Sequence, residues 1–180
     1  LGGDGTEYLK KIVQVQLELP AASLTEVHQL FFEQLSELVP PHEVDEGSRT
    51  AFGNAFHDGI CHFLNTPRDV KRLVNVLRVI YPVLVGEVYW PDFVSIATLM
   101  VFAPQVHRTI CLAPEHFVGS VGFREFDRGT ERTFHDEWLK GAPDNDRSSV
   151  ERIVRRLFPK FGAAMGGSQY GPDWEPRWRT

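Results

Sequence analysis

Positively charged side chains recur along one face of the helix that the sequence predicts after Thr66. At 100° per residue, residues 67–81 separate into an apolar face and a polar face that carries Arg68, Lys71, Arg72, Asn75 and Arg78 and is interrupted by Val79. Two interpretations are open: a solvated face that pairs with acidic neighbours, or a contact for an anion such as a nucleotide phosphate. Under the second, Arg68 is the main candidate. It lies in the first turn, where the helix dipole favours an anion, and arginine binds phosphate through two parallel hydrogen bonds.

Two pairs of potential metal ligands share a second spacing. His57 and Cys61 are four residues apart on one predicted helix, and His107 and Cys111 repeat this spacing on another. Together the four side chains have the types required for a tetrahedral zinc site. The alternative is that the cysteines are small core residues of their helices, and both interpretations stay open at this point.

The elements that must position these residues begin with a strand. Residues from Val13 to Leu19 alternate apolar and polar side chains, and Pro20 ends the run. A single strand followed by helices needs a sheet to join, so we expect the rest of that sheet to precede it.

Helices are predicted for most of the chain after Pro20. Ser23 and Glu26 have the spacing of a capping box at the start of an amphipathic helix, which ends at Val39-Pro40-Pro41. Thr66 and Pro67 are typical of an N-cap and a first helical residue. Further helices are expected over residues 49–64, 67–81, 90–101, 105–112, 131–140 and 147–158.

Several boundaries follow from the same patterns. Residues 42–48 are expected to be a polar loop and residues 114–130 to be irregular, and Pro104 should break or kink the apolar helix before it. Ser148 or Ser149 is the expected cap of the helix over 147–158. The chain thus divides into a strand region over residues 1–20, a helical part over 21–162 and an irregular tail over 163–180, and its fold class is mostly α.

Composition limits the classes of function. The chain has 180 residues and a net charge of −5, which gives no electrostatic case for binding nucleic acid or an anionic membrane. It has two cysteines and no apolar run of membrane-spanning length, so a cytoplasmic location is expected. Because the chain starts at Leu1 and stops after Trp178-Arg179-Thr180, we expect that both ends were cut from a longer protein. In the tail, Trp174 and Trp178 either dock on the rest of that protein or a partner, or have no fixed structure.

Three separated stretches together resemble the KAP family of P-loop NTPases. The first is Tyr8-Leu9-Lys10-Lys11-Ile12-Val13-Gln14-Val15, the second is the run from Thr66 to Arg78, and the third runs from Gly86 to Pro104. The late Leu157-Phe158-Pro159 and the following aromatic residues also fit. The resemblance covers nearly the whole chain in the same order. It departs from the family at Lys10, where an acid is usual, and at Thr98-Leu99-Met100, which lacks the usual Glu and Arg.

The resemblance implies that this chain is the lid and sensor portion of a KAP-type ATPase, following the last strand of an α/β P-loop core. Arg68 would sense the γ-phosphate of ATP, with Lys71 or Arg72 as lesser candidates. The sequence has no G-x-x-x-x-G-K-[ST] motif and no Walker B acid. Hydrolysis by this chain alone is therefore not expected, and ATP and Mg²⁺ would be bound by the full-length parent. The family also implies the rest of the NTPase domain as a partner, a link to phage defence in bacteria and, for some members, membrane association, and it leaves an oligomer open.

Two other classes of function compete with the ATPase lid. One is a helical protein-interaction module whose basic helix face binds an acidic partner, and the other is a small helical domain supported by zinc. An interaction module should carry this basic helix face, called the basic stripe below, on a continuous surface that is complete within the chain. A lid should present Arg68 on the side where the P-loop core attaches.

Overall fold

The computed structural model describes residues 22–119 and 127–166, and every regular element within these ranges is helical. The mostly α prediction is therefore confirmed for the described residues. The strand predicted over Val13–Leu19 lies outside them. Among the described residues, no helix is both long and apolar enough to cross a bilayer.

The first helix forms as its sequence predicts. α2 spans Leu24–Leu38, and the Ser23 hydroxyl accepts a hydrogen bond from the amide of Glu26, whose carboxylate accepts one from the amide of Ser23 at 2.7 Å. Its core face buries Val27, Phe31 and Leu35, and the helix ends at the C-cap Val39, directly before Pro40. Local capping and periodicity are sufficient to explain this element.

A continuous helical run follows, and it starts earlier than expected. η1 is a 3₁₀ turn over Pro41–Glu43, and α3 begins at Glu46 because Asp45 and Ser48 form a capping box of their own. The prediction of a polar loop over 42–48 was therefore wrong for its last residues. α3 (Glu46–Ala55) continues through a π-helical turn, η2 (Phe56–Ile60), into α4 (Cys61–Phe63). This continuous run agrees with the helix expected over 49–64.

The next three helices contain the most apolar part of the chain. α5 spans Pro67–Leu84, α6 spans Trp90–Phe102, and α7 spans Pro104–Leu112 after a break at Ala103. α6 packs against α3, α5, α7 and α9, which explains its almost wholly apolar sequence. The two buried hydroxyls of α6, on Ser95 and Thr98, each donate to a carbonyl one turn back at 2.8 Å, so they are satisfied without leaving the helix.

The C-terminal helices differ from their predicted bounds. After the short turn η3 (Pro114–His116), α8 spans Arg128–Lys140, α9 spans Asp144–Leu157 and α10 spans Pro159–Ala164, so the helical part extends just past residue 162. The prediction that Ser148 or Ser149 caps the helix over 147–158 was wrong, since both lie inside α9. The helix starts earlier, after Pro143, because Asp144 and Asp146 favour the positive end of its dipole.

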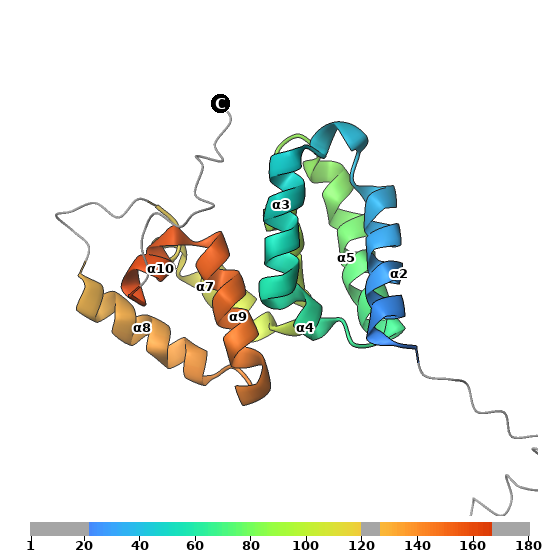
Figure 1. The fold of residues 1–180 in the computed structure, drawn as a ribbon. Coiled ribbons are helices and arrows are strands. Elements are labelled where there is room, and N and C mark those ends of the chain that lie inside the picture. Colours follow the sequence, from blue (N-terminus) through green and yellow to red (C-terminus); the bar gives the residue numbers. More distant parts are fainter. Residues whose placement is uncertain (1–21, 120–126, 167–180) are drawn as a thin grey trace, which may run out of the picture.

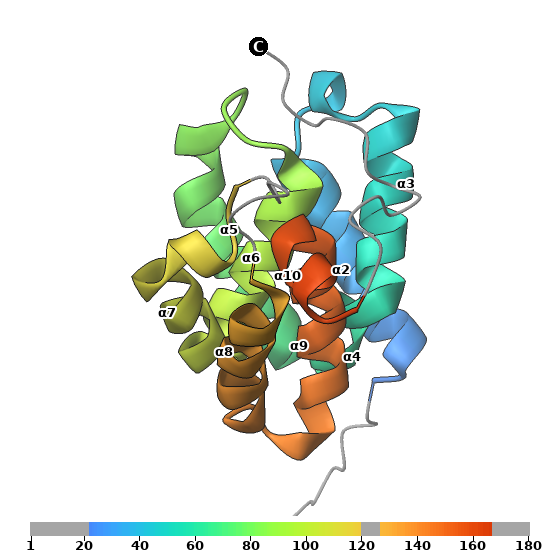
Figure 2. The ribbon, with the colours of Figure 1, turned by 90° about the vertical axis from the view of Figure 1, so that its left-hand side faces the viewer.

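Two groups of helices make up the described structure. α2, α3 and α5 lie side by side, and α8, α9 and α10 form the second group on the other side of α3 (Figure 1). The view turned by 90° shows α7, α8, α9 and α10 in front of the first group (Figure 2). α9 joins the groups by packing on the π-helical turn η2.

Gly59 in this turn explains how closely the two groups approach. A Cβ atom at Gly59 would lie 2.5 Å from Cγ1 of Ile153 and 2.8 Å from the carbonyl oxygen of Ser149, both on α9. Beside this contact, the Arg156 guanidinium lies 2.5 Å from the Asp58 carboxylate, and Arg152 donates to the Asp58 carbonyl. The absence of a side chain at Gly59 thus lets α9 pack directly on the backbone of the turn.

Candidate functional site

The candidate site begins at the first turn of α5, which is fixed by side chains on both sides of the cap. The Thr66 hydroxyl accepts a hydrogen bond from the amide of Asp69 at 3.3 Å, and the Asp69 carboxylate accepts from the Thr66 amide at 3.0 Å and from its hydroxyl at 2.7 Å. The predicted N-cap at Thr66 is confirmed. Since Asp69 already places a carboxylate at this helix end, an external anion would be met by side chains rather than by the helix amides.

Arg68 in this turn and Lys71 at the start of the next are the uncommitted cations of the site. Both side chains are exposed, and neither makes a hydrogen bond or ion pair with another described residue. They lie three residues apart on the helix and therefore share one side of it. The Asp69 carboxylate between them in the sequence is bound to the Thr66 cap, so these two neighbouring cations form a surface suited to an anionic partner.

The other two cations of the stripe have partners within the fold. Arg72 donates to the carbonyl of Val101 at 3.2 Å, and its guanidinium carbon lies 5.0 Å from the ring centroid of Phe102. Arg78 lies 3.6 Å from the carboxylate of Glu37 on α2. Val101 and Glu37 are 29 and 41 residues away in the sequence, so helical periodicity does not reveal these two partners. Arg72 also lies 3.9 Å from the Asp69 carboxylate, a contact that the i, i+3 spacing does show.

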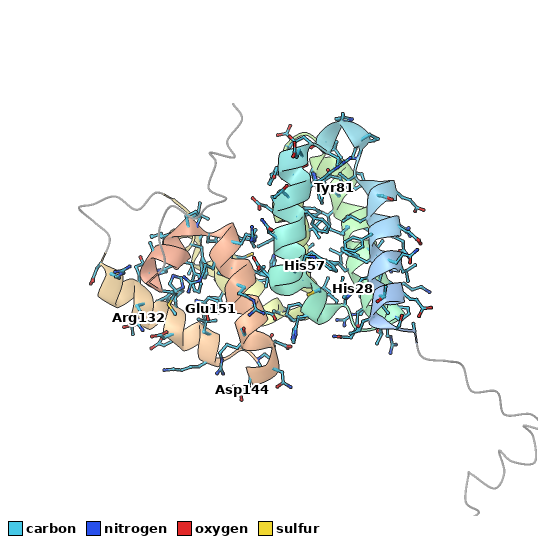
Figure 3. All side chains as sticks on the ribbon, viewed as in Figure 1. His28, His57, Tyr81, Arg132, Asp144 and Glu151 are labelled. Atoms are coloured by element: carbon cyan, nitrogen blue, oxygen red, sulfur yellow. The ribbon has the colours of Figure 1, made fainter. Side chains whose placement is uncertain are left out.

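The ion pair between Arg78 and Glu37 also fits the direction of α5 relative to α2. Glu37 is in the last turn of α2 and Arg78 is in the second half of α5, and the two helices run in the same direction (Figure 1). Figure 3 places His28, near the start of α2, and Tyr81, near the end of α5, at opposite ends of this pair. Arg68 therefore lies at the same end as Ser23, where the chain enters from residues 1–21.

The predicted histidine and cysteine ligands do not gather into one site. The Cys111 sulfur lies 3.8 Å from Nε2 of His107, whereas the Cys61 sulfur contacts the carbonyl oxygen of His57 at 3.7 Å rather than its ring. Each contact stays within one helical run, η2–α4 or α7. In the part of the chain that the structure describes, no group of three or more histidine, cysteine or acidic side chains could hold a metal ion.

A cluster of titratable groups that the sequence analysis did not identify lies in the second group of helices. Glu131 on α8 is its centre: its carboxylate lies 2.9 Å from Nδ1 of His116, 3.4 Å from the Lys160 ammonium and 3.9 Å from Nε2 of His135. Lys160 also donates to the carbonyl of Glu115. Glu131 and His135 are four residues apart on α8, which is the only sequence signal for this cluster.

His135 is the buried member of this cluster. Its side chain is 0% exposed, and its Nδ1 accepts a hydrogen bond from the Trp138 indole at 2.9 Å, so the ring is neutral with its proton on Nε2. Burial lowers the pKa of His135 to about 4, an effect that the nearby Glu131 carboxylate only partly offsets. Nε2 of His135 has no hydrogen-bond partner among the described residues. The ammonium of Lys160 already neutralises Glu131, which favours a structural role for the cluster.

Comparison with known families finds a match, which covers the N-terminal part of the chain through α5. Residues 2–84 match the family described as the KAP family P-loop domain. The matched region ends at Leu84, which is also the last residue of α5. The predicted resemblance to the KAP family of P-loop NTPases is therefore confirmed.

One curated relative is similar over nearly the whole chain. This is the phage T7 exclusion protein of Escherichia coli (strain K12), which is 28% identical over 177 residues, covering 96% of this chain. The chain spans 22% of the length of that relative. No solved structure matches the chain.

Proposed function

We propose that this chain forms the lid and sensor portion of a KAP-type ATPase, and that α5 closes over ATP held by the P-loop core. In this proposal Arg68 contacts the γ-phosphate, Lys71 is the second contact, and ATP and Mg²⁺ are bound mainly by parts of the parent outside this chain. The family match supports a P-loop NTPase, and the roles of α5 and Arg68 are the proposal itself.

One observation carries the proposal: two cations of the basic face of α5, Arg68 and Lys71, have no partner among the described residues, and both lie within the first five residues of the helix. Arg72 and Arg78, further along, bind groups of the helical fold. Arg68 and Lys71 have no such partner among the described residues. They lie at the end of the first helical group where α2 begins, directly after residues 1–21. A P-loop core that precedes α2 would be connected at this end.

The chemistry of phosphoryl transfer supports this assignment. The transition state carries its charge on the oxygens of the γ-phosphoryl group, and catalysis consists mostly of positioning and charge stabilisation. A guanidinium that arrives with a moving helix completes such a site only after nucleotide has bound. The capping box fixes the backbone at Thr66, so the position of Arg68 follows the movement of the whole helix.

A second candidate function is supported by the far end of the same helix. Val79 and Val83 are 75% and 80% exposed. They lie on the same side of α5 as the basic face, about one and two turns after Asn75. A surface that is cationic at one end and apolar at the other also suits an acidic protein partner. In this alternative the chain is a helical interaction module, and α5 binds a protein instead of a nucleotide.

Two measurements separate the two functions: ATP hydrolysis and nucleotide binding. Both are made on a longer protein that contains this chain and its P-loop core. The lid function predicts that Arg68→Ala impairs hydrolysis more than nucleotide binding. The interaction function predicts unchanged hydrolysis in Arg68→Ala, together with weaker partner binding in both Arg68→Ala and Val83→Asp.

A further inference from the structure

An apolar groove crosses the other end of the first helical group. It has a volume of about 360 Å³ and lies between the second half of α2, η1 and the first turns of α3. Its lining residues are Phe32, Leu35, Ser36, Val39, Pro41, Val44, Arg49, Phe52 and Trp90. Because Leu35 and Val39 are near the end of α2, the groove is remote from Arg68 and independent of the proposed nucleotide contact.

The floor of the groove is aromatic, and its one indole N–H is already hydrogen-bonded. Phe52 and Trp90 are buried with their ring centroids 4.9 Å apart, and the Trp90 indole donates to the carbonyl of Glu43 at 3.1 Å. At the rim, Phe32 is 42% exposed and stands edge-on to Phe52 at 6.3 Å. Such a surface gains most from an aromatic or proline-containing ligand that stacks on it.

The positive charge of Arg49 favours a ligand that carries a negative charge. Arg49 lines the groove from the first turn of α3. Its side chain is exposed and makes no hydrogen bond or ion pair with another described residue. An unpaired guanidinium beside an aromatic floor favours a ligand with an aromatic side chain next to a carboxylate.

We propose that the occupant of this groove is the segment of the same chain over residues 170–176, with Trp174 on the aromatic floor and Asp173 or Glu175 against Arg49. The sequence of this segment, Tyr170-Gly171-Pro172-Asp173-Trp174-Glu175-Pro176, places one aromatic side chain between two carboxylates and two prolines. Aromatic grooves bind such proline-flanked segments in an extended form. The stretch from Gly166, the last described residue, to Trp174 can extend to about 27 Å.

The test uses the full chain labelled with 5-fluorotryptophan, whose four tryptophans give separate ¹⁹F resonances. The Trp174 resonance, assigned with Trp174→Phe, is compared with that of a synthetic peptide of residues 170–176. Docking predicts different frequencies, and it predicts that Arg49→Glu reduces the docked population about fivefold and moves the resonance toward that of the peptide. The Trp178 resonance serves as the matched control and should not respond.

Charge reversal separates docking from damage to the fold. Arg49 is exposed, so Arg49→Glu should leave the thermal unfolding midpoint nearly unchanged, and combining it with Asp173→Arg and Glu175→Arg should restore the docked resonance. The proposal is overturned if Trp174 resonates at the peptide frequency in the unmodified chain. It is also overturned if the shift depends on protein concentration, since the occupant would then come from a second copy.

Discussion

Arg78 on α5 and Glu37 on α2 form an ion pair with 3.6 Å between guanidinium nitrogen and carboxylate oxygen. Both side chains are largely exposed, so the pair contributes at most about 1 kcal/mol to stability. Its importance is geometric. It joins the last turn of α2 to the second half of α5, and the first turns of these two parallel helices lie at the opposite end (Figure 1).

The close packing of α9 on η2 predicts that Gly59→Ala destabilises the fold. The new Cβ would meet Ile153 and the Ser149 backbone, so we expect a loss of about 1–3 kcal/mol in the free energy of unfolding. Urea denaturation followed by circular dichroism measures this loss.

Gly53→Ala, one turn and a half earlier in the same helical run, is the matched control. No atom lies within 4 Å of a Cβ at Gly53, so alanine should stabilise the helix by up to about 1 kcal/mol. Equal destabilisation by both substitutions would contradict the close approach at Gly59.

Burial of His135 predicts that stability falls with acidification. Its pKa is about 4 in the fold and near its ordinary value of 6.5 in the unfolded chain, so the unfolded chain binds more protons between these values. The contribution is fully present above pH 6.5 and is lost progressively as the pH falls toward 4, for a total of about 3 kcal/mol.

His135→Phe isolates this contribution from the acid titration of other groups. Glu131, His116 and Lys160 face His135 and also respond to pH, so the informative quantity is the difference between the two proteins. The substitution also leaves the Trp138 indole without its acceptor, a loss that is the same at all pH values. We expect the pH dependence of unfolding to be shallower in His135→Phe between pH 6.5 and 4, and identical slopes would count against a buried neutral imidazole.

The capping box of α5 predicts the cost of losing Thr66. Thr66→Ala removes the acceptor for the amide of Asp69 and should reduce the free energy of unfolding by about 1 kcal/mol. Thr66→Ser, which keeps the hydroxyl, should have little effect. Thermal unfolding of the two variants makes the comparison, and a Thr66→Ser loss as large as that of Thr66→Ala would show that the methyl group, rather than the cap, is responsible.

Local signals in the sequence predicted the elements whose start or face depends on neighbouring residues. The capping box at Ser23, the N-cap at Thr66 and the apolar stretch from Trp90 belong to this class, because caps and periodicity act within a few residues. The start of α9 was predicted wrongly because serine is common both as a cap and inside a helix. The expected cap was Ser148 or Ser149, whereas the helix starts at Asp144 with Pro143 as its N-cap.

Contacts between distant segments could not be predicted in this way. The partners of Arg72 and Arg78, and the approach of Ile153 to Gly59, depend on how whole helices pack. The same holds for His116 and Lys160 around Glu131. For the candidate site, the sequence predicted the basic face of α5. Packing then distinguished its two engaged arginines from Arg68 and Lys71.

The most direct test of the central proposal is the turnover number for ATP in a longer protein that contains this chain and its P-loop core. Arg68→Ala should reduce kcat at least tenfold while the Kd for ATP changes by less than about threefold, since a lid arginine acts mainly after nucleotide has bound. Arg78→Ala, on the same face but paired with Glu37, should leave both values near those of the unmodified protein. Unchanged turnover in Arg68→Ala would contradict the proposal and remove Arg68 from the mechanism.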